Sequence, residues 1–137
     1  MLLNLSLVQL ARFTLGLAWI YHGLIPKLLH VDPLERIITE SLGLNSQYSL
    51  VFTQSAGVAE ILLGIALILF YKNPLLIYFS ALNLAALLVF TIIFIPQVAL
   101  SAFNPVTTNI PLLVLSVVLL QNTQQKPTIT QSKQERE

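Results

Sequence analysis

The sequence has no cysteine, only two histidines and few charged side chains, which make up 9% of its 137 residues. Without cysteine the chain forms no disulfide, no thiolate metal site and no CxxC redox motif. A soluble domain carries about 25% charged residues, so water is not the solvent for most of this surface. The formal charge of +1 is too small to indicate a nucleic-acid partner. These absences favour a membrane protein whose redox role, if it has one, depends on a bound cofactor or a partner subunit.

Apolar sequence is abundant, because 55% of the residues are hydrophobic. A helix that crosses the hydrocarbon layer needs about 20 mostly apolar residues. Stretches that meet this requirement predict four transmembrane helices, at residues 3–26, 49–71, 75–96 and 104–121. The prediction is an all-α integral membrane four-helix bundle over residues 1–121. Residues 122–137 are polar and lack periodicity, which predicts a disordered cytoplasmic tail.

A short segment between the first two spans predicts a helix that lies on the membrane surface. Asp32 is a good N-cap, Pro33 suits the first turn, and Glu35 stands at the capping-box position. Apolar residues then recur on one face, and Gly43 can end the helix. We therefore expect a short interfacial helix between the first and second spans.

Basic residues outside the spans predict the orientation of the chain. The second connection and the C-terminal tail carry four of them, and the first connection carries two. In order, these are Lys72, Lys126, Lys133 and Arg136, and then Lys27 and Arg36. The excess predicts that both termini lie in the cytoplasm.

Two charged residues interrupt the apolar spans, Arg12 in the first and Glu60 in the second. A charged side chain at the centre of a bilayer costs about 2.5–3.5 kcal/mol on insertion scales, so such residues usually face a partner or a wet cavity. The first span runs outward and the second returns, which predicts an Arg12–Glu60 contact at matched depth, with Asn83 as a third member. Glycines beside both charges favour close packing of the two helices. The alternative is that the pair only fixes the packing of the helices.

Other polar residues lie toward the outer ends of the spans. His22 can relay protons, ligate haem iron or hydrogen-bond a quinone carbonyl, or it can simply bond to a neighbouring helix. Lys27 either extends into the lipid headgroups or holds an anionic group at the mouth of a cavity. Trp19 can stack on a flat ligand or on a guanidinium. Asn104 begins the last helix and can direct its N–H groups into the cavity.

The sequence offers no nucleophile–base arrangement, no phosphate loop and no complete metal site. An isolated enzyme is therefore the least favoured class, although the sequence leaves catalysis open and gives no catalytic residue. No metal site is predicted. The sequence does not identify a cofactor. Quinone is one candidate, and haem is less favoured because it would have to be shared with a second protomer.

Three segments together resemble DoxX-like membrane proteins: ARFTLGLAWIYHGLIPKLL at residues 11–29, AGVAEILLGIALIL at 56–69 and AFNPVTTNIPLLVLSVVLL at 102–120. The resemblance covers residues 8–120 and leaves out the tail. It implies a four-helix bundle in a bacterial cytoplasmic (inner) membrane. It also implies a small subunit associated with sulfur or quinone redox chemistry. The polar signature residues of the family map onto Arg12, His22, Lys27, Glu60 and Asn104.

Three functions follow as hypotheses. The first is a redox-associated accessory subunit that binds a quinone-like or other small amphipathic ligand in a polar intramembrane pocket, beside an oxidoreductase partner. The second is transport of a small solute or of protons along the same polar residues, which would require a homo-oligomer because four helices enclose little room. The third is a purely structural membrane partner.

Overall fold

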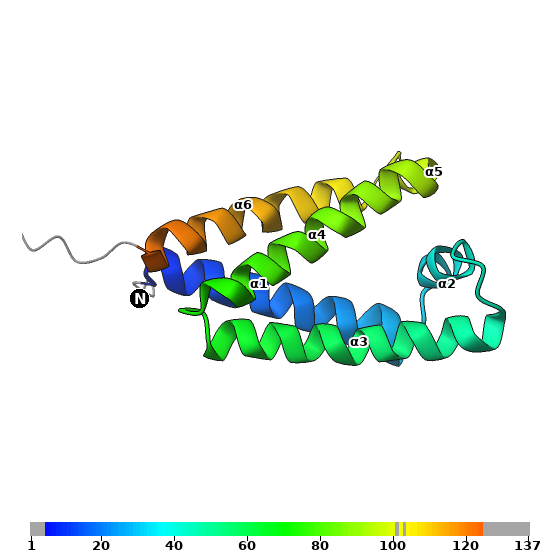
Figure 1. The fold of residues 1–137 in the computed structure, drawn as a ribbon, viewed down its shortest axis with the longest axis horizontal. Helices are drawn as coiled ribbons and strands as arrows, with labels where there is room; N and C mark the ends of the chain where they lie inside the picture. The colour runs from blue at the N-terminus through cyan, green and yellow to red at the C-terminus, as the bar shows by residue number, and fades with distance from the viewer. Residues whose placement is uncertain (1–4, 101, 103, 125–137) are drawn as a thin grey trace, which may run out of the picture.

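The computed structural model describes residues 5–100, 102 and 104–124, and over these residues it consists of helices and short connections without strands (Figure 1). The long helices are α1 (Leu7–Leu24), α3 (Ser46–Leu69), α4 (Pro74–Phe94) and α6 (Pro105–Gln124). The short ones are a π-helical turn (Ile25–Leu29), α2 (Pro33–Glu40) and α5 (Pro96–Ala99). The prediction of an all-helical chain is confirmed. The predicted tail lies outside the described residues from residue 125 onward, and residues 122–124 belong to α6.

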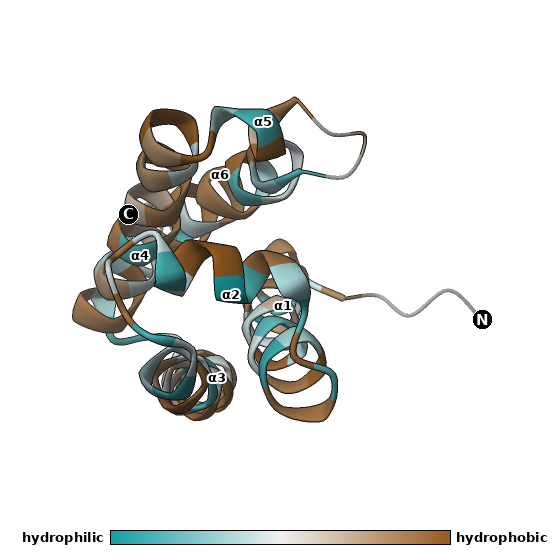
Figure 2. Cartoon of the chain, turned by 90° about the vertical axis from the view of Figure 1, so that its right-hand side faces the viewer, coloured by the Kyte–Doolittle hydropathy of each residue, from teal (hydrophilic) through white to brown (hydrophobic). Residues whose placement is uncertain are grey.

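The long helices pack as two pairs, α1 on α3 and α4 on α6. The pairs are joined mainly where α1 contacts α6, whereas α3 and α4 touch little. In Figure 1 the two pairs lie close together near the N-terminus and separate toward α2 and α5. Figure 2 looks onto that wider end and shows α2 lying across it between the pairs. The two helix pairs therefore diverge toward the end of the molecule that holds α2 and α5 (Figure 1).

Two glycine pairs set the register of α1 against α3. Gly16 lies against Gly64 and Gly23 against Gly57, and the seven-residue spacing keeps each helix's glycines on one face. A Cβ atom on Gly57 would lie 2.7 Å from the carbonyl oxygen of Gly23 and 2.8 Å from the Cβ of Lys27. The backbones can approach this closely only because neither helix carries a side chain there.

Three of the described helices are long and apolar enough to cross a membrane: α3, α4 and α6. Their outward faces carry large apolar side chains, such as Leu62, Leu82 and Val114, each more than half exposed. The brown ribbon in Figure 2 shows how much of the long helices is hydrophobic. Such surfaces are stable against lipid and unfavourable in water.

The predicted start of α2 is confirmed, and the helix ends at Glu40, three residues before Gly43. The Asp32 side chain accepts a hydrogen bond of 2.8 Å from the backbone N–H of Leu34, and Pro33 occupies the first turn. Gly43 follows the helix with φ at +83°, a left-handed conformation that suits glycine. Glu35, however, does not turn back to complete a capping box. Its carboxylate points toward Lys27 instead.

Candidate functional site: a buried charged cluster beneath α2

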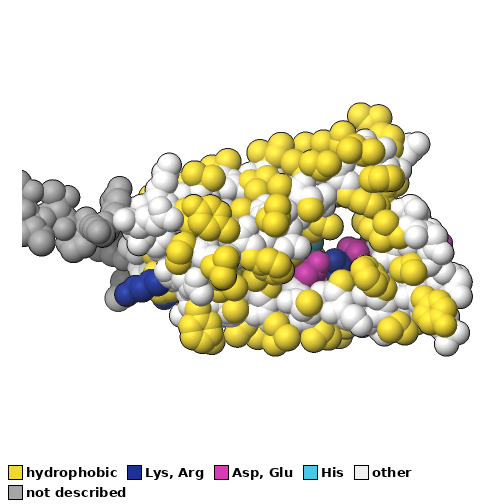
Figure 3. Space-filling view, in the orientation of Figure 1, with side chains coloured by type: hydrophobic (Ala, Val, Ile, Leu, Met, Phe, Trp, Pro, Cys, Tyr) yellow, Lys and Arg dark blue, Asp and Glu magenta, His cyan; other side chains and the backbone are white. Residues whose placement is uncertain are grey.

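Three charged side chains from three different elements meet beneath α2. The Nζ atom of Lys27 lies 2.5 Å from Oε1 of Glu60 and 3.5 Å from Oε2 of Glu35. The side chains of Lys27, Glu35 and Glu60 are only 8%, 20% and 13% exposed. In Figure 3, dark-blue, magenta and cyan side chains gather at the inner end of a hollow between α2 and α3 on one side and the far end of α4 on the other. We call Lys27, Glu35 and Glu60 the Lys27 cluster.

The π-helical turn places Lys27 in this cluster. Pro26 has no N–H to donate, and the N–H of His30 bonds to the carbonyl of Ile25 at 3.0 Å, one residue further along than in an α-helix. Lys27 lies on this wider turn and packs its side chain against Gly57 of α3. Of the two interpretations of Lys27, extension into the headgroups does not fit the structure, because the side chain is buried between two carboxylates.

The Lys27 cluster contains more acceptors than donors. With all three groups ionised, two carboxylates face one ammonium and leave one net negative charge. Oε2 of Glu60 is buried and has no hydrogen-bond partner among the described residues. The hydroxyl oxygen of Thr53, seven residues earlier on the same face of α3, is also buried without a partner there. The His22 ring lies close enough to interact electrostatically with both Glu60 and Lys27. The arrangement can therefore accept a hydrogen bond or a proton from a ligand.

Burial raises the pKa of Glu35 above its ordinary value of 4.5, and this effect outweighs the attraction of the Lys27 charge, which lowers the pKa. The folded protein thus binds the Glu35 proton more tightly than the unfolded chain does. The resulting contribution to stability is complete below pH 4.5 and is lost as the pH rises through the raised pKa of the folded state.

We expect a Glu35→Gln variant to lose this pH dependence, because glutamine does not titrate. The difference in unfolding temperature between the wild type and the variant should change in favour of the variant as the pH rises above 4.5. Thermal unfolding of both proteins in detergent, on either side of that pH, measures the effect. Glu40→Gln is the matched control, since the Glu40 side chain is 42% exposed. Parallel pH profiles for wild type and Glu35→Gln would contradict the prediction.

The predicted Arg12–Glu60 contact is wrong. The glycine pairs place Arg12 level with Ile68 and Glu60 level with Ile20. These levels are about eight residues, or about 12 Å, apart along the helix axis. The Arg12 guanidinium instead lies over the rings of Tyr71 and Phe13, 4.5 and 4.7 Å from their centroids. Arg12 therefore contacts aromatic rings near the start of α1, and the cation that pairs with Glu60 is Lys27.

The other predicted site residues do not join the Lys27 cluster. Asn83 donates from Nδ2 to the carbonyl of Phe79 on its own helix at 2.8 Å, so it is not a third member. Trp19 is buried in the core and donates from Nε1 to the hydroxyl of Ser80 at 2.7 Å, which ties α1 to α4. The Asn104 side chain accepts from the backbone N–H of Thr107 at 3.0 Å and caps α6.

Sequence reasoning missed Glu35 as a site residue. The capping-box pattern gave the residue a local role, and nothing in the sequence indicated that α2 lies over Lys27. It also missed the buried hydrogen bond between the hydroxyls of Thr39 and Ser49, which holds α2 onto α3. Among the residues described, no three His, Asp or Glu side chains lie close enough together to bind a metal ion.

The helices and the buried charges identify the chain as a membrane protein with a charged cluster inside its helical bundle. The chain belongs to the DoxX-like family, whose model matches residues 16–117. This match confirms the resemblance inferred from the sequence. Neither the curated proteins nor the solved structures include a significant match to the chain.

Proposed function

We propose that the chain is a small four-helix membrane subunit that binds the polar head of a quinone-like amphipathic ligand at the Lys27 cluster. In this proposal α1 crosses the bilayer beside α3, against which its glycines pack, and α2 lies at the outer interface. Both termini are cytoplasmic in a bacterial inner membrane, as the excess of basic residues in the second connection and tail favours.

The observation that supports this proposal best is the unpaired Oε2 atom of Glu60 beside a buried lysine. A buried acceptor without a donor costs about 1–3 kcal/mol, and more when it is charged, so a ligand that supplies a donor is stabilised there. The hydroxyl group of a quinol is such a donor. A quinone carbonyl can in turn accept a hydrogen bond from the ammonium of Lys27, which has three N–H groups and two carboxylate neighbours.

The residues present therefore fit a quinone or quinol headgroup. A bound quinone would supply two-electron, two-proton redox chemistry. The side chains of the chain would bind and orient its head, and Glu60 would hold a proton at Oε2. His22 would provide a second proton acceptor, since its ring interacts electrostatically with Glu60. An oxidoreductase partner subunit would supply or withdraw the electrons.

Binding is favoured over transport by the layer below the Lys27 cluster. Buried apolar side chains of Leu15, Leu63 and Leu67 lie between the level of Glu60 and the end of the bundle that holds Arg12. Within the described part of the bundle, these side chains lie between the Lys27 cluster and Arg12. A path for a solute or for protons would require polar residues or water at that level.

We expect a Glu60→Gln variant to lose the ligand. Glutamine keeps the size of the side chain but removes the charge, and hydrogen bonds to charged groups contribute about 1.5–3 kcal/mol, so quinone retention should fall roughly tenfold or more. Mass spectrometry of the lipids that co-purify with the full chain measures this.

Glu40→Gln, which changes an exposed carboxylate, is the matched control and should retain the quinone. Equal quinone in the Glu60→Gln and wild-type preparations would refute the proposed site. Absence of quinone from the wild type, together with solute flux in proteoliposomes, would favour transport instead.

A further inference from the structure

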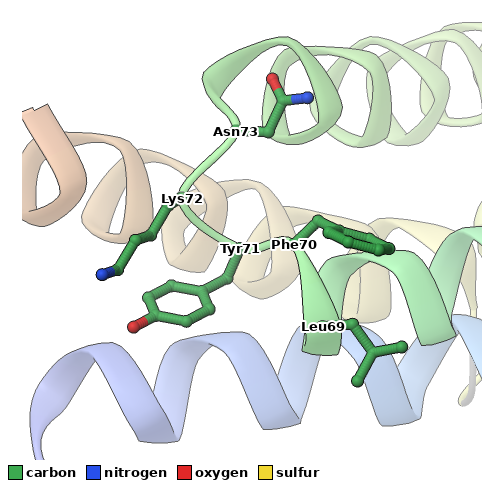
Figure 4. A pocket seen from close by; sticks show the side chains of 5 residues that line it. All are labelled: Leu69, Phe70, Tyr71, Lys72 and Asn73. Atoms are coloured by element: carbon green, nitrogen blue, oxygen red, sulfur yellow. The ribbon is translucent and has the colours of Figure 1, made fainter.

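A second group of charged residues lies at the opposite end of the bundle, where α3 ends and α4 begins. The guanidinium of Arg12 lies 4.5 Å from the centroid of the Tyr71 ring, and the ammonium of Lys72 lies 5.9 Å from the same centroid. One aromatic ring thus interacts with two cations. Figure 4 shows Tyr71 and Lys72 extending from the α3–α4 connection, with the ribbon of α1 below them in the view. We call Arg12, Tyr71 and Lys72 the basic end site.

The two cations have no acidic partner in the described part of the chain. The acidic residues there are Asp32, Glu35, Glu40 and Glu60, which belong to α2, its N-cap and the Lys27 cluster at the other end. Nε of Arg12 is buried and has no hydrogen-bond partner among the described residues. Burying this N–H group without a hydrogen-bond acceptor is unfavourable. The contact with the Tyr71 ring offsets only part of this cost, so an anion that accepts a hydrogen bond from Arg12 would be stabilised here.

An open hollow of about 660 Å³ lies beside the Tyr71 ring that Arg12 contacts, and it is lined by Leu69, Phe70, Tyr71, Lys72 and Asn73 (Figure 4). Its size is within the range of small-ligand sites, which is about 300–1,000 Å³. Leu69 and Phe70 are apolar and more than 60% exposed on the lipid-facing end of α3, whereas Lys72 follows them in the connection. The hollow therefore has one apolar and one cationic side, and it lies where α3 ends.

We propose that the basic end site binds the phosphate of an anionic phospholipid, with acyl chains along Leu69 and Phe70. The guanidinium offers forked N–H donors that match phosphate oxygens, and Lys72 adds a second positive charge. Tyr71 positions the guanidinium through its ring. This site is separate from the Lys27 cluster and does not depend on the proposed quinone site.

Native mass spectrometry of the full chain in detergent, titrated with phosphatidylglycerol or phosphatidylcholine, tests the proposal. We expect the wild type to bind phosphatidylglycerol roughly tenfold more tightly than phosphatidylcholine, and Arg12→Gln or Lys72→Gln to remove most of this preference. Arg12→Lys keeps the charge but loses the forked donors, so it should retain part of the preference. This retention would show that the loss in Arg12→Gln does not come from misfolding. Arg36→Gln, a cation exposed on α2, is the control and should bind like the wild type.

Several outcomes would overturn the proposal. Equal affinity of the wild type for both lipids would show that the headgroup charge is not recognised. Equal loss of the preference in Arg12→Gln and Arg36→Gln would show that net charge acts, not this site. Displacement of the lipid by inorganic phosphate alone would assign the site to a free anion. Tighter lipid binding in a Glu135→Gln/Glu137→Gln variant would assign it to carboxylates of the C-terminal segment.

Discussion

Replacing Lys27 by methionine should lower the free energy of unfolding by about 3–5 kcal/mol, because removal of one partner from a buried ion pair leaves the other charge uncompensated. Glu60 would lose the cation 2.5 Å from its Oε1 atom, and Glu35 would lose the cation 3.5 Å from its Oε2 atom. Methionine fills a similar volume, so the lower free energy of unfolding would result from the missing charge and not from a cavity. Unfolding of the purified protein in mixed detergent micelles measures the free energy.

Two comparisons make this result specific. Arg36→Met also removes a cation next to a carboxylate, but the Arg36 side chain is 47% exposed, and exposed pairs contribute about 0–1 kcal/mol. A Lys27→Met/Glu60→Gln double variant should recover part of the lost stability, because it removes the unpaired charge as well. If Lys27→Met and Arg36→Met were equally mild, the Lys27 cluster would not be a buried ion pair in the folded protein.

Valine at position 57 should lower the free energy of unfolding by about 1–3 kcal/mol, the usual cost of overpacking. Its Cβ would lie 2.7 Å from the carbonyl oxygen of Gly23, which is backbone and cannot rotate away. The two helices would have to separate. The same Cβ would lie 2.8 Å from that of Lys27, so quinone retention should fall together with stability.

Ala59→Val is the matched control for this substitution. It adds the same kind of side chain two residues along α3, at an exposed position. The variant should unfold like the wild type in the same micelle assay and should keep its quinone. Similar losses from Gly57→Val and Ala59→Val would mean that β-branched residues weaken α3 wherever they occur, and that the glycine contact is not the cause.

The sequence was sufficient to predict the long helices and α2, because each depends on local chemistry. Apolar runs of about 20 residues indicate the long helices. The Asp32 N-cap marks the start of α2, and Gly43 lies in the turn that follows it. The partners of the charged residues depend on register instead. Arg12 and Glu60 were expected at the same level because each lies well inside its own apolar span. The glycine contacts, however, place the two residues about two helical turns apart along the helix axis.

Lys27 shows a second limit. In an uninterrupted α-helix a lysine at this position would be expected to reach the headgroups, as the sequence suggested. The π-helical turn that begins at Ile25 adds one residue to the turn and directs Lys27 toward α3. Pro26 signals a disturbance of the helix, but proline more often marks a kink or an end, so the direction of the following side chains could not be predicted.

The apolar layer of Leu15, Leu63 and Leu67 also has a consequence for energy conversion. In the proposed function, a quinone bound at the Lys27 cluster would exchange its protons with the aqueous compartment on the α2 side of the membrane. Turnover of a quinone there would change the acidity of that compartment alone. The protein would thus contribute to a transmembrane pH gradient without conducting a single ion.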